Sequence, residues 1–176
     1  NTATSTISMV VRKSDDQSPI INSFSANDTS VDLKTSSQSQ TVTFTVNASD
    51  NRGISTISVP GTTVGSSSGN NYTFNKTYSY GDYSFGSSSD TLTATVNDAA
   101  GNTTTDTITI SITKSDDQNP VISNLSVNDS SVELKTSSPS QTVTFTAAIT
   151  DNVSISSVSF GGLTPSISGN NYTWSK

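Results

Sequence analysis

Apolar and polar residues alternate along several stretches of the chain, which is the pattern of strands with one buried face. Val42, Phe44 and Val46 are separated by threonines, and the same two-residue period recurs around residues 92–96 and 108–112. Val, Ile and Thr favour strands because their branched side chains pack well on a pleated surface. No stretch keeps apolar residues at helical spacing for more than one turn. The pattern therefore predicts an all-β protein.

The predicted strands are short and are separated by turns rich in Gly, Asn and Ser. Their expected ranges are 20–26, 30–34, 40–48, 54–60, 71–79, 90–97 and 103–113. About seven antiparallel strands in about 100 residues are typical of a β-sandwich. The residues expected to fill its core are Ile21, Phe24, Val31, Leu33, Val42, Phe44, Val46, Ile54, Ile57, Val59, Tyr72, Phe74, Leu92, Val96, Ile108 and Ile110.

The sequence repeats itself with a period of 101 residues. Residues 14–63 and 115–164 are identical at 30 of 50 positions. After a one-residue deletion, Gly69–Thr73 matches Gly169–Thr173. A repeated module suits a protein whose role is reach or valency better than one built around a single active site.

The register of the repeat predicts where the modules begin and end. Residues 1–13 align with residues 102–114, so we expect them to be the last strand of a preceding module. Residues 14–114 then form one complete module, and residues 115–176 form a second module that is incomplete at its C-terminal end. The chain is interpreted as a window on a longer tandem array, with strands supplied by a neighbouring subunit as the alternative.

Composition restricts the chemistry that is open to the chain. It contains no cysteine and no histidine, so a serine nucleophile has no histidine base and zinc lacks its usual ligands. Eight Lys and Arg residues stand against 14 Asp and Glu, and the net charge of −6 disfavours nucleic acid as a partner. No apolar run reaches the length of a membrane span. We therefore expect no enzymatic activity and no membrane insertion in this segment.

Three acidic segments carry a family resemblance. They are Asp98–Asn102 and Asp50–Ile54, each after an alternating strand, and a linker, Ser14–Pro19, that ends in proline. Together they make the chain resemble bacterial immunoglobulin-like repeats, the extender modules of large surface adhesins, which are distantly similar to cadherin repeats. The resemblance implies tandem immunoglobulin-like antiparallel β-sandwiches in a structural spacer of an extracellular adhesin or fibre, at a cell or virion surface. Its partners would be neighbouring modules and neighbouring copies in a filament.

The chemistry that the sequence supports best is a calcium site at the linker end of each module. In a sandwich of this strand order the linker enters beside two acidic loops, and calcium prefers six to eight oxygen ligands. The candidate ligands are Asp15, Asp16, Asp50, Asn51 and Asp98 in the first module, and Asp116, Asp117, Asp151 and Asn152 in the second. A bound ion would cancel carboxylate repulsion and stiffen the linker. The alternative is that these residues only form turns, because Asp and Asn side chains bond to nearby backbone.

Aromatic residues leave a second function open. Tyr80 and Tyr83 lie in a glycine-containing loop where exposed rings could stack on a sugar. The alternative function is therefore a carbohydrate-binding or decorating module on a virion, a surface layer or a secreted enzyme, with a glycan as partner. Tyr72 and Phe74 alternate and recur as Tyr172 and Trp174, so we expect these four residues in the core.

Overall fold

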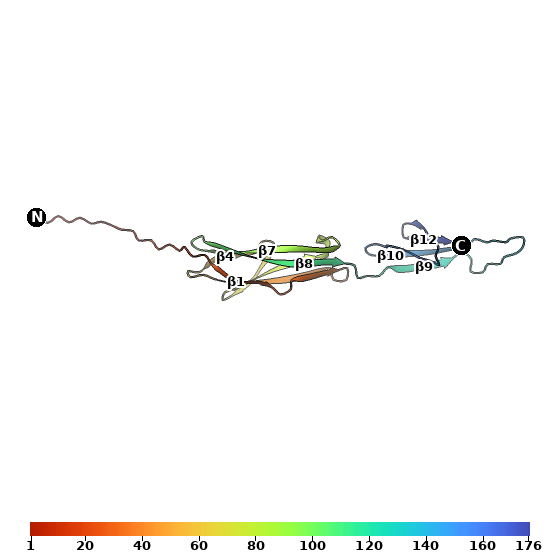
Figure 1. The fold of residues 1–176 in the computed structure, drawn as a ribbon, viewed down its shortest axis with the longest axis horizontal. Coiled ribbons are helices and arrows are strands. Elements are labelled where there is room, and N and C mark those ends of the chain that lie inside the picture. The colour runs from red at the N-terminus through yellow and green to blue at the C-terminus, as the bar shows by residue number, and fades with distance from the viewer. The chain divides into compact units, whose positions relative to one another are not determined.

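The computed structural model describes all 176 residues and is all-β, which confirms the predicted class (Figure 1). Apart from its strands it contains one short 3-10 turn, η1 (Tyr80–Asp82), and no helix long and apolar enough to cross a bilayer. The chain divides into two compact units. Unit 1 comprises residues 1–33 and 37–115, and unit 2 comprises residues 34–36 and 116–176.

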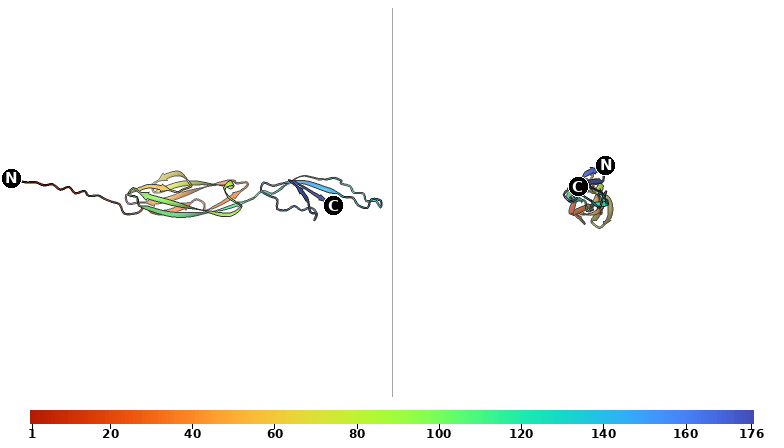
Figure 2. Two further views of the ribbon diagram at one scale, coloured as in Figure 1. Left: turned by 90° about the horizontal axis from the view of Figure 1, so that it is seen from above. Right: turned by 90° about the vertical axis from the view of Figure 1, so that its right-hand side faces the viewer.

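Unit 1 contains two four-stranded sheets. The first has the order β1 (Ile20–Ala26), β3 (Ser39–Ser49), β6 (Asn71–Ser79) and β5 (Thr63–Ser68). The second has the order β2 (Ser30–Lys34), β8 (Thr103–Ser115), β7 (Gly86–Asp98) and β4 (Ile54–Ser58). Strands β7 and β8 form an antiparallel pair from Gly86 opposite Lys114 to Asn97 opposite Thr103. The strands run lengthwise along the unit (Figure 2).

One hydrophobic core is shared by the two sheets of unit 1. Phe44 and Val46 from β3 and Leu92 and Val96 from β7 are all buried in it. Every residue that the sequence assigned to the core is either buried there or packed against it. Its further buried members are Ala48, Tyr78, Ala94 and Ile112. Period-two alternation therefore identified the inward faces of these strands correctly.

Strand β5 was not predicted, because it has no apolar alternation and all six of its residues are exposed. It pairs with β6, and Gly65 makes that approach possible. A Cβ atom at this position would lie 2.5 Å from Oγ1 of Thr73 and 3.1 Å from its carbonyl oxygen. A glycine in a strand pattern thus marks close backbone approach here rather than a loop.

Unit 2 contains one four-stranded sheet with the order β11 (Ser166–Ser168), β12 (Asn171–Ser175), β10 (Thr144–Thr150) and β9 (Val121–Val127). Phe145 on β10 lies opposite Trp174 on β12, just as Phe44 lies opposite Phe74 between β3 and β6. Ala147, Ile149, Tyr172 and Trp174 form its buried core. The expectation that Tyr172 and Trp174 lie in the core is confirmed.

The segment of unit 2 that corresponds to β2 forms no strand. Ser131–Lys135 differs from β2 only by Glu133 in place of aspartate, yet Val132 and Leu134 are 46% and 61% exposed. Their counterparts in β2, Val31 and Leu33, are fully buried. Strand β2 is an edge strand whose sheet neighbour is β8, and unit 2 holds no counterpart of β8.

Residues 1–13 form an extended segment that belongs to no strand (Figures 1 and 2). All of them are exposed, including the apolar Ile7, Met9 and Val11. The interpretation of this segment as a strand of a preceding module stays a prediction.

Candidate metal centre

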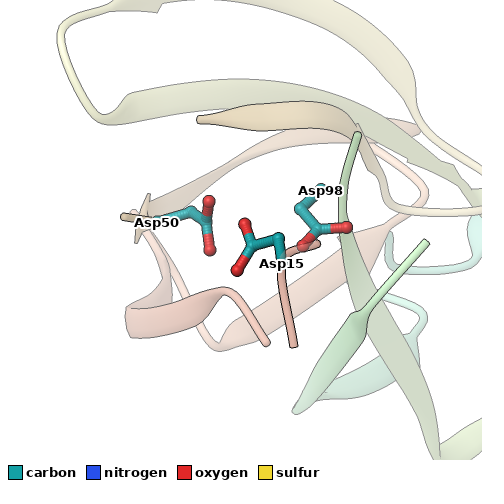
Figure 3. A group of neighbouring side chains, drawn as sticks. All are labelled: Asp15, Asp50 and Asp98. Carbon is teal, nitrogen blue, oxygen red and sulfur yellow. The ribbon is translucent and has the colours of Figure 1, made fainter. Parts of the chain in front are cut away.

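Three carboxylates meet at the end of unit 1 where the linker enters. Oxygens of Asp15, Asp50 and Asp98 all lie within 4.8 Å of one another, and Figure 3 shows the three side chains facing a common space. Asp15 belongs to the segment before β1, Asp50 follows β3 directly, and Asp98 is the last residue of β7. These are the three segments from which the sequence predicted the site.

The linker is held in place by a residue that the sequence did not identify. The side-chain amide of Asn102 donates to the backbone carbonyls of Asp15 at 3.3 Å and of Gln17 at 3.1 Å. Thr104 donates its hydroxyl to the carbonyl of Pro19, whose ring is buried. The turn between β7 and β8 therefore fixes the position of Asp15.

Asp98 is 4% exposed and is almost fully engaged in turn formation. Its Oδ1 accepts the N–H groups of Ala100, Gly101 and Asn102 at 2.7–2.9 Å, and its Oδ2 accepts the Asn102 amide at 2.7 Å. Burial by itself would raise the pKa of Asp98, but these hydrogen bonds outweigh it and lower the pKa below its ordinary value. Gly101 supplies the left-handed backbone of the turn, with φ at 96°.

Asp50 and Asp15 are half-buried and less fully bonded. Oδ1 of Asp50 accepts the N–H of Arg52 at 2.8 Å, and Oδ1 of Asp15 accepts the Asn51 amide at 3.3 Å. The Oδ2 atoms of both residues accept no hydrogen bond from the protein, and none of the three carboxylates forms an ion pair with a lysine or arginine. Their mutual repulsion is therefore not balanced by a protein cation.

The remaining candidates of the first module lie around this trio. Asn51 contacts it through its bond to Asp15. Asp16 is exposed and is not one of the three converging residues. Of the five ligands predicted for the first module, three carboxylates converge and one amide, that of Asn51, lies beside them. The fifth, Asp16, does not join the cluster.

In unit 2 the equivalent residues repeat part of this arrangement. Asn152 donates to Oδ1 of Asp116 at 3.4 Å, as Asn51 does to Asp15. Oδ1 of Asp151 accepts the N–H groups of Val153 and Ser154, both at 2.8 Å. The group of three converging carboxylates occurs in unit 1 alone.

Asp117 has a set of partners that the sequence did not predict. Within unit 2 it accepts hydrogen bonds from the Ser36 hydroxyl, from the Thr35 hydroxyl at 2.6 Å, and from the Ser36 N–H at 3.1 Å. The bonds from the Ser36 and Thr35 hydroxyls lower the pKa of Asp117 to about 2, against a smaller opposing effect of burial. Asp117 is therefore a strong acceptor for the Thr35–Ser36 loop.

The trio in unit 1 fits a calcium ion better than other metals. Oxygens that share one Ca²⁺ at 2.3–2.6 Å lie no more than about 5.2 Å apart, and the spacing of the three carboxylates meets this limit. Zinc prefers nitrogen and sulfur ligands, and Mg²⁺ retains its waters. The ligands on offer are Asp15 and Asp50, each with an oxygen that has no protein partner, and Oδ2 of Asp98.

The aromatic residues considered for sugar binding are half-buried rather than displayed. Tyr80 and Tyr83 pack against the core of unit 1. Nζ of Lys114 lies 4.0 Å from the centre of the Tyr80 ring and donates to the carbonyl of Tyr83 at 2.7 Å. Phe85, half-exposed, contacts Tyr80 edge to face. One face of the Tyr80 ring is thus already covered by a cation.

Compared with known proteins, the chain matches no family model and no curated protein. The resemblance to immunoglobulin-like repeats therefore depends on the residues of the linker and the two acidic loops. The fold itself, all-β with antiparallel sheets, depends on the structure.

Proposed function

We propose that the chain is part of a tandem array of immunoglobulin-like β-sandwich modules and acts as a structural spacer in a long extracellular adhesin or fibre. The observation that carries the proposal is that unit 2 repeats the hydrogen bonds of unit 1 as well as its sequence. Residues copied together with their bonding pattern indicate selection for a duplicated scaffold. A single catalytic or binding site would not require such duplication.

The repeated bonds hold the corner after the first strand of each unit. The Asn27 side chain accepts the N–H of Thr43 at 2.7 Å, and Asn128 accepts that of Thr144 at the same distance. Gln40 donates to Asp28 at 2.9 Å, and the equivalent pair, Gln141 and Asp129, is 2.7 Å apart. These are structural contacts between side chain and backbone or between neighbouring strands, and none of them lines a reactive site.

In this proposal the carboxylate trio binds Ca²⁺ and makes the linker rigid. The ion would neutralise Asp15, Asp50 and Asp98 and tie the linker to the ends of β3 and β7. A ligand that binds only the folded state stabilises it by about 2.7 kcal/mol at a hundred times its dissociation constant. Calcium would thus raise the stability of unit 1 and restrict the motion of Ser14–Pro19.

The test is the thermal unfolding of the full chain in millimolar Ca²⁺ and in chelator. We expect a higher melting temperature in Ca²⁺, and Asp50→Ala or Asp15→Ala should abolish the difference. Asp106→Ala is the control, because Asp106 is exposed on β8, lies outside the trio and removes the same charge. Asp16→Ala tests the remaining linker acid in the same assay.

Two results would contradict the calcium part of the proposal. One is a melting temperature that is the same in Ca²⁺ and in chelator, which would leave the three acids as turn residues. The other is an equal loss of the calcium effect in Asp106→Ala. The spacer function is tested separately by the coding sequence on either side of this segment. We expect it to encode further copies of the module at a spacing of about 101 residues.

The alternative function, a carbohydrate-binding module, has less support because Lys114 covers one face of Tyr80. It predicts that the chain is retained on a glycan array and that Tyr80→Ala or Tyr83→Ala abolishes retention. A spacer shows no such affinity.

A further inference from the structure

We propose that the side of unit 1 between β4 and β5 binds the same side of a second copy of this chain. On this side a hollow of about 340 Å³ is lined by residues of β4, β5 and β6, among them Ile57, Val64, Tyr72 and Phe74. All of these residues lie within unit 1 and far from both ends of the sequence. The proposal depends on neither calcium nor the spacer function.

Val64 is an apolar side chain at the rim of the core. It lies opposite Phe74, which is buried, so both side chains are on the face of the sheet that points toward the other sheet. Val64 is nevertheless 81% exposed, because β5 is the edge strand. At the opposite edges of the two sheets, Phe24 on β1 packs against the core, and Val31 and Leu33 on β2 are fully buried. The core of unit 1 is therefore covered along β1 and β2 but not along β5.

Strand β5 also lacks the features that discourage an edge strand from pairing with another chain, which are charged residues and proline. The edge strand β2 carries Asp32 and Lys34, whereas β5 has the sequence Thr-Val-Gly-Ser-Ser-Ser. In the second copy, Pro165 stands directly before the equivalent strand, β11, which is three residues long. Of the two copies, the first thus has the longer and less protected strand.

The contact would be made by side chains more than by backbone. The pairing of β5 with β6 shifts between Val64 and Ser67, and the N–H of Ser66 donates to Oγ1 of Thr73 at 2.7 Å. Such a bulge interrupts regular pairing with a further strand. Burial of Val64 in the hollow of the partner removes apolar surface from water and favours association. Because Val64 itself lines the hollow, the Val64 side chains of the two copies would lie together in a two-fold symmetric contact.

Charge favours a second copy as the partner. No residue from 53 to 75 is charged, and this run includes β4, β5 and most of β6. It ends at Lys76, whose Nζ is paired with Oδ2 of Asp90 at 2.7 Å. The chain has a net charge of −6, so two copies repel each other in general. A side without unpaired like charges is where they can approach at the least electrostatic cost.

A single contact of this size is weak. Strand β5 has six residues and is therefore about 20 Å long, and stable complexes bury about 800 Å² on each partner. We expect monomers and dimers in exchange rather than a permanent dimer. In a tandem array, many such contacts would act together and hold fibres side by side. This last step alone depends on the spacer function.

The first experiment is sedimentation velocity of the full chain over a range of concentrations. We expect the mean mass to rise toward that of a dimer. Val64→Asp should raise the dissociation constant by about tenfold or more, because it places two carboxylates together in an apolar contact. Ile20→Asp is the matched control: Ile20 is 62% exposed on β1, the opposite edge of the same sheet, so this variant should dimerise like the original chain. Circular dichroism checks that both variants are folded.

A second experiment tests the symmetry of the contact. Val64→Lys should weaken dimerisation as Val64→Asp does, whereas an equimolar mixture of the two variants should restore it, because opposite charges then meet. The chain contains no cysteine, so single cysteines report contacts without background. Under mild oxidation Val64→Cys should form disulfide-linked dimers, and Ile20→Cys should form far fewer.

Three results would overturn the proposal. The first is a chain that stays monomeric at all concentrations, which would leave the hollow to a partner of another kind. The second is association that Val64→Asp does not weaken more than Ile20→Asp does, which would indicate a different surface. The third is a mixture of Val64→Asp and Val64→Lys that dimerises no better than either variant alone.

Discussion

Asp98 shows how one side chain can end a strand and shape a site. It closes β7 by accepting three consecutive backbone N–H groups of the exposed turn that follows, which would otherwise need water as their partner. Its other oxygen aligns Asn102, and Asn102 in turn holds the carbonyls of Asp15 and Gln17. Turn formation and metal binding are therefore compatible at this residue, because the turn uses mainly Oδ1 and the trio can use Oδ2.

Asp117 provides the prediction at this scale. Its pKa is lowered to about 2, so its ionised form is more stable in the folded protein than in the unfolded chain. The stabilisation is complete above the unfolded value of 3.8 and is lost as the pH falls toward 2. A carboxyl-carbon NMR titration of the full chain should show Asp117 titrating near pH 2.

Ser36→Ala removes the first of the bonds that lower the pKa of Asp117, and it should move the midpoint toward 3.8. Ser37→Ala, at the next position, alters a serine for which no bond to Asp117 is present and should leave the midpoint unchanged. A midpoint near 3.8 in the original chain would show that the Thr35–Ser36 contacts do not form in solution.

The sequence could predict which acids converge, but not how they are held. Strand order alone brings the ends of β3 and β7 to the same end of the unit, which places Asp50 and Asp98 near the linker. The role of Asn102 could not be read from the sequence, because it depends on a side chain that reaches the carbonyls of residues more than 80 positions away. Asp117 is a similar case, since its equivalence to Asp16 says nothing of Thr35 and Ser36.

At the scale of elements, the same pentapeptide pattern is a strand in one unit and not in the other. Ser30–Lys34 forms β2, whereas Ser131–Lys135 forms no strand. Local propensity is nearly identical, so the difference comes from pairing: β2 has β8 beside it. Strand propensity depends on neighbouring strands more than on the backbone itself. Sequence patterns therefore located inward faces well, but missed β5 and could not decide whether an edge strand forms.

A matched pair of core substitutions tests this dependence on neighbours. Phe44 is fully buried in a core that both sheets share, and Phe44→Ala should lower the free energy of unfolding of unit 1 by about 3–5 kcal/mol. Phe145 is the equivalent residue on β10, but it is only partly buried and lines a surface hollow. Phe145→Ala should therefore cost less in unit 2.

Denaturant titration of both variants measures the two costs. Thr43→Ala is an unsuitable control because the Thr43 hydroxyl donates to Oδ1 of Asn75 at 2.8 Å. Thr93→Ala is better, since Thr93 is exposed on β7 and should change the stability little. Equal costs for Phe44→Ala and Phe145→Ala would mean that Phe145 is covered in solution as completely as Phe44.

At the scale of the whole molecule, the two units differ in how completely they bury their apolar residues. Unit 1 has a core built from two sheets, whereas unit 2 has four buried core residues on one sheet and a hollow lined by Val127, Val132 and Leu134 beside them. Unit 2 also contains a buried polar atom that lowers its stability. Nε1 of Trp174 is buried with no hydrogen-bond partner, and an unsatisfied buried donor costs about 1–3 kcal/mol. The equivalent residue in unit 1 is Phe74, which has no such donor.

Unit 2 should therefore unfold before unit 1, and the chain contains its own probe for this. Trp174 is the one tryptophan, it is 2% exposed, and it lies in unit 2, so tryptophan fluorescence follows that unit alone. Far-UV circular dichroism follows the strands of both units. We expect the fluorescence transition at lower denaturant than the main transition in circular dichroism. Trp174→Phe should remove the unpaired N–H and move the early part of the circular dichroism transition to higher denaturant. Coinciding transitions would show instead that the two units unfold together, and the difference in their cores would then not determine stability.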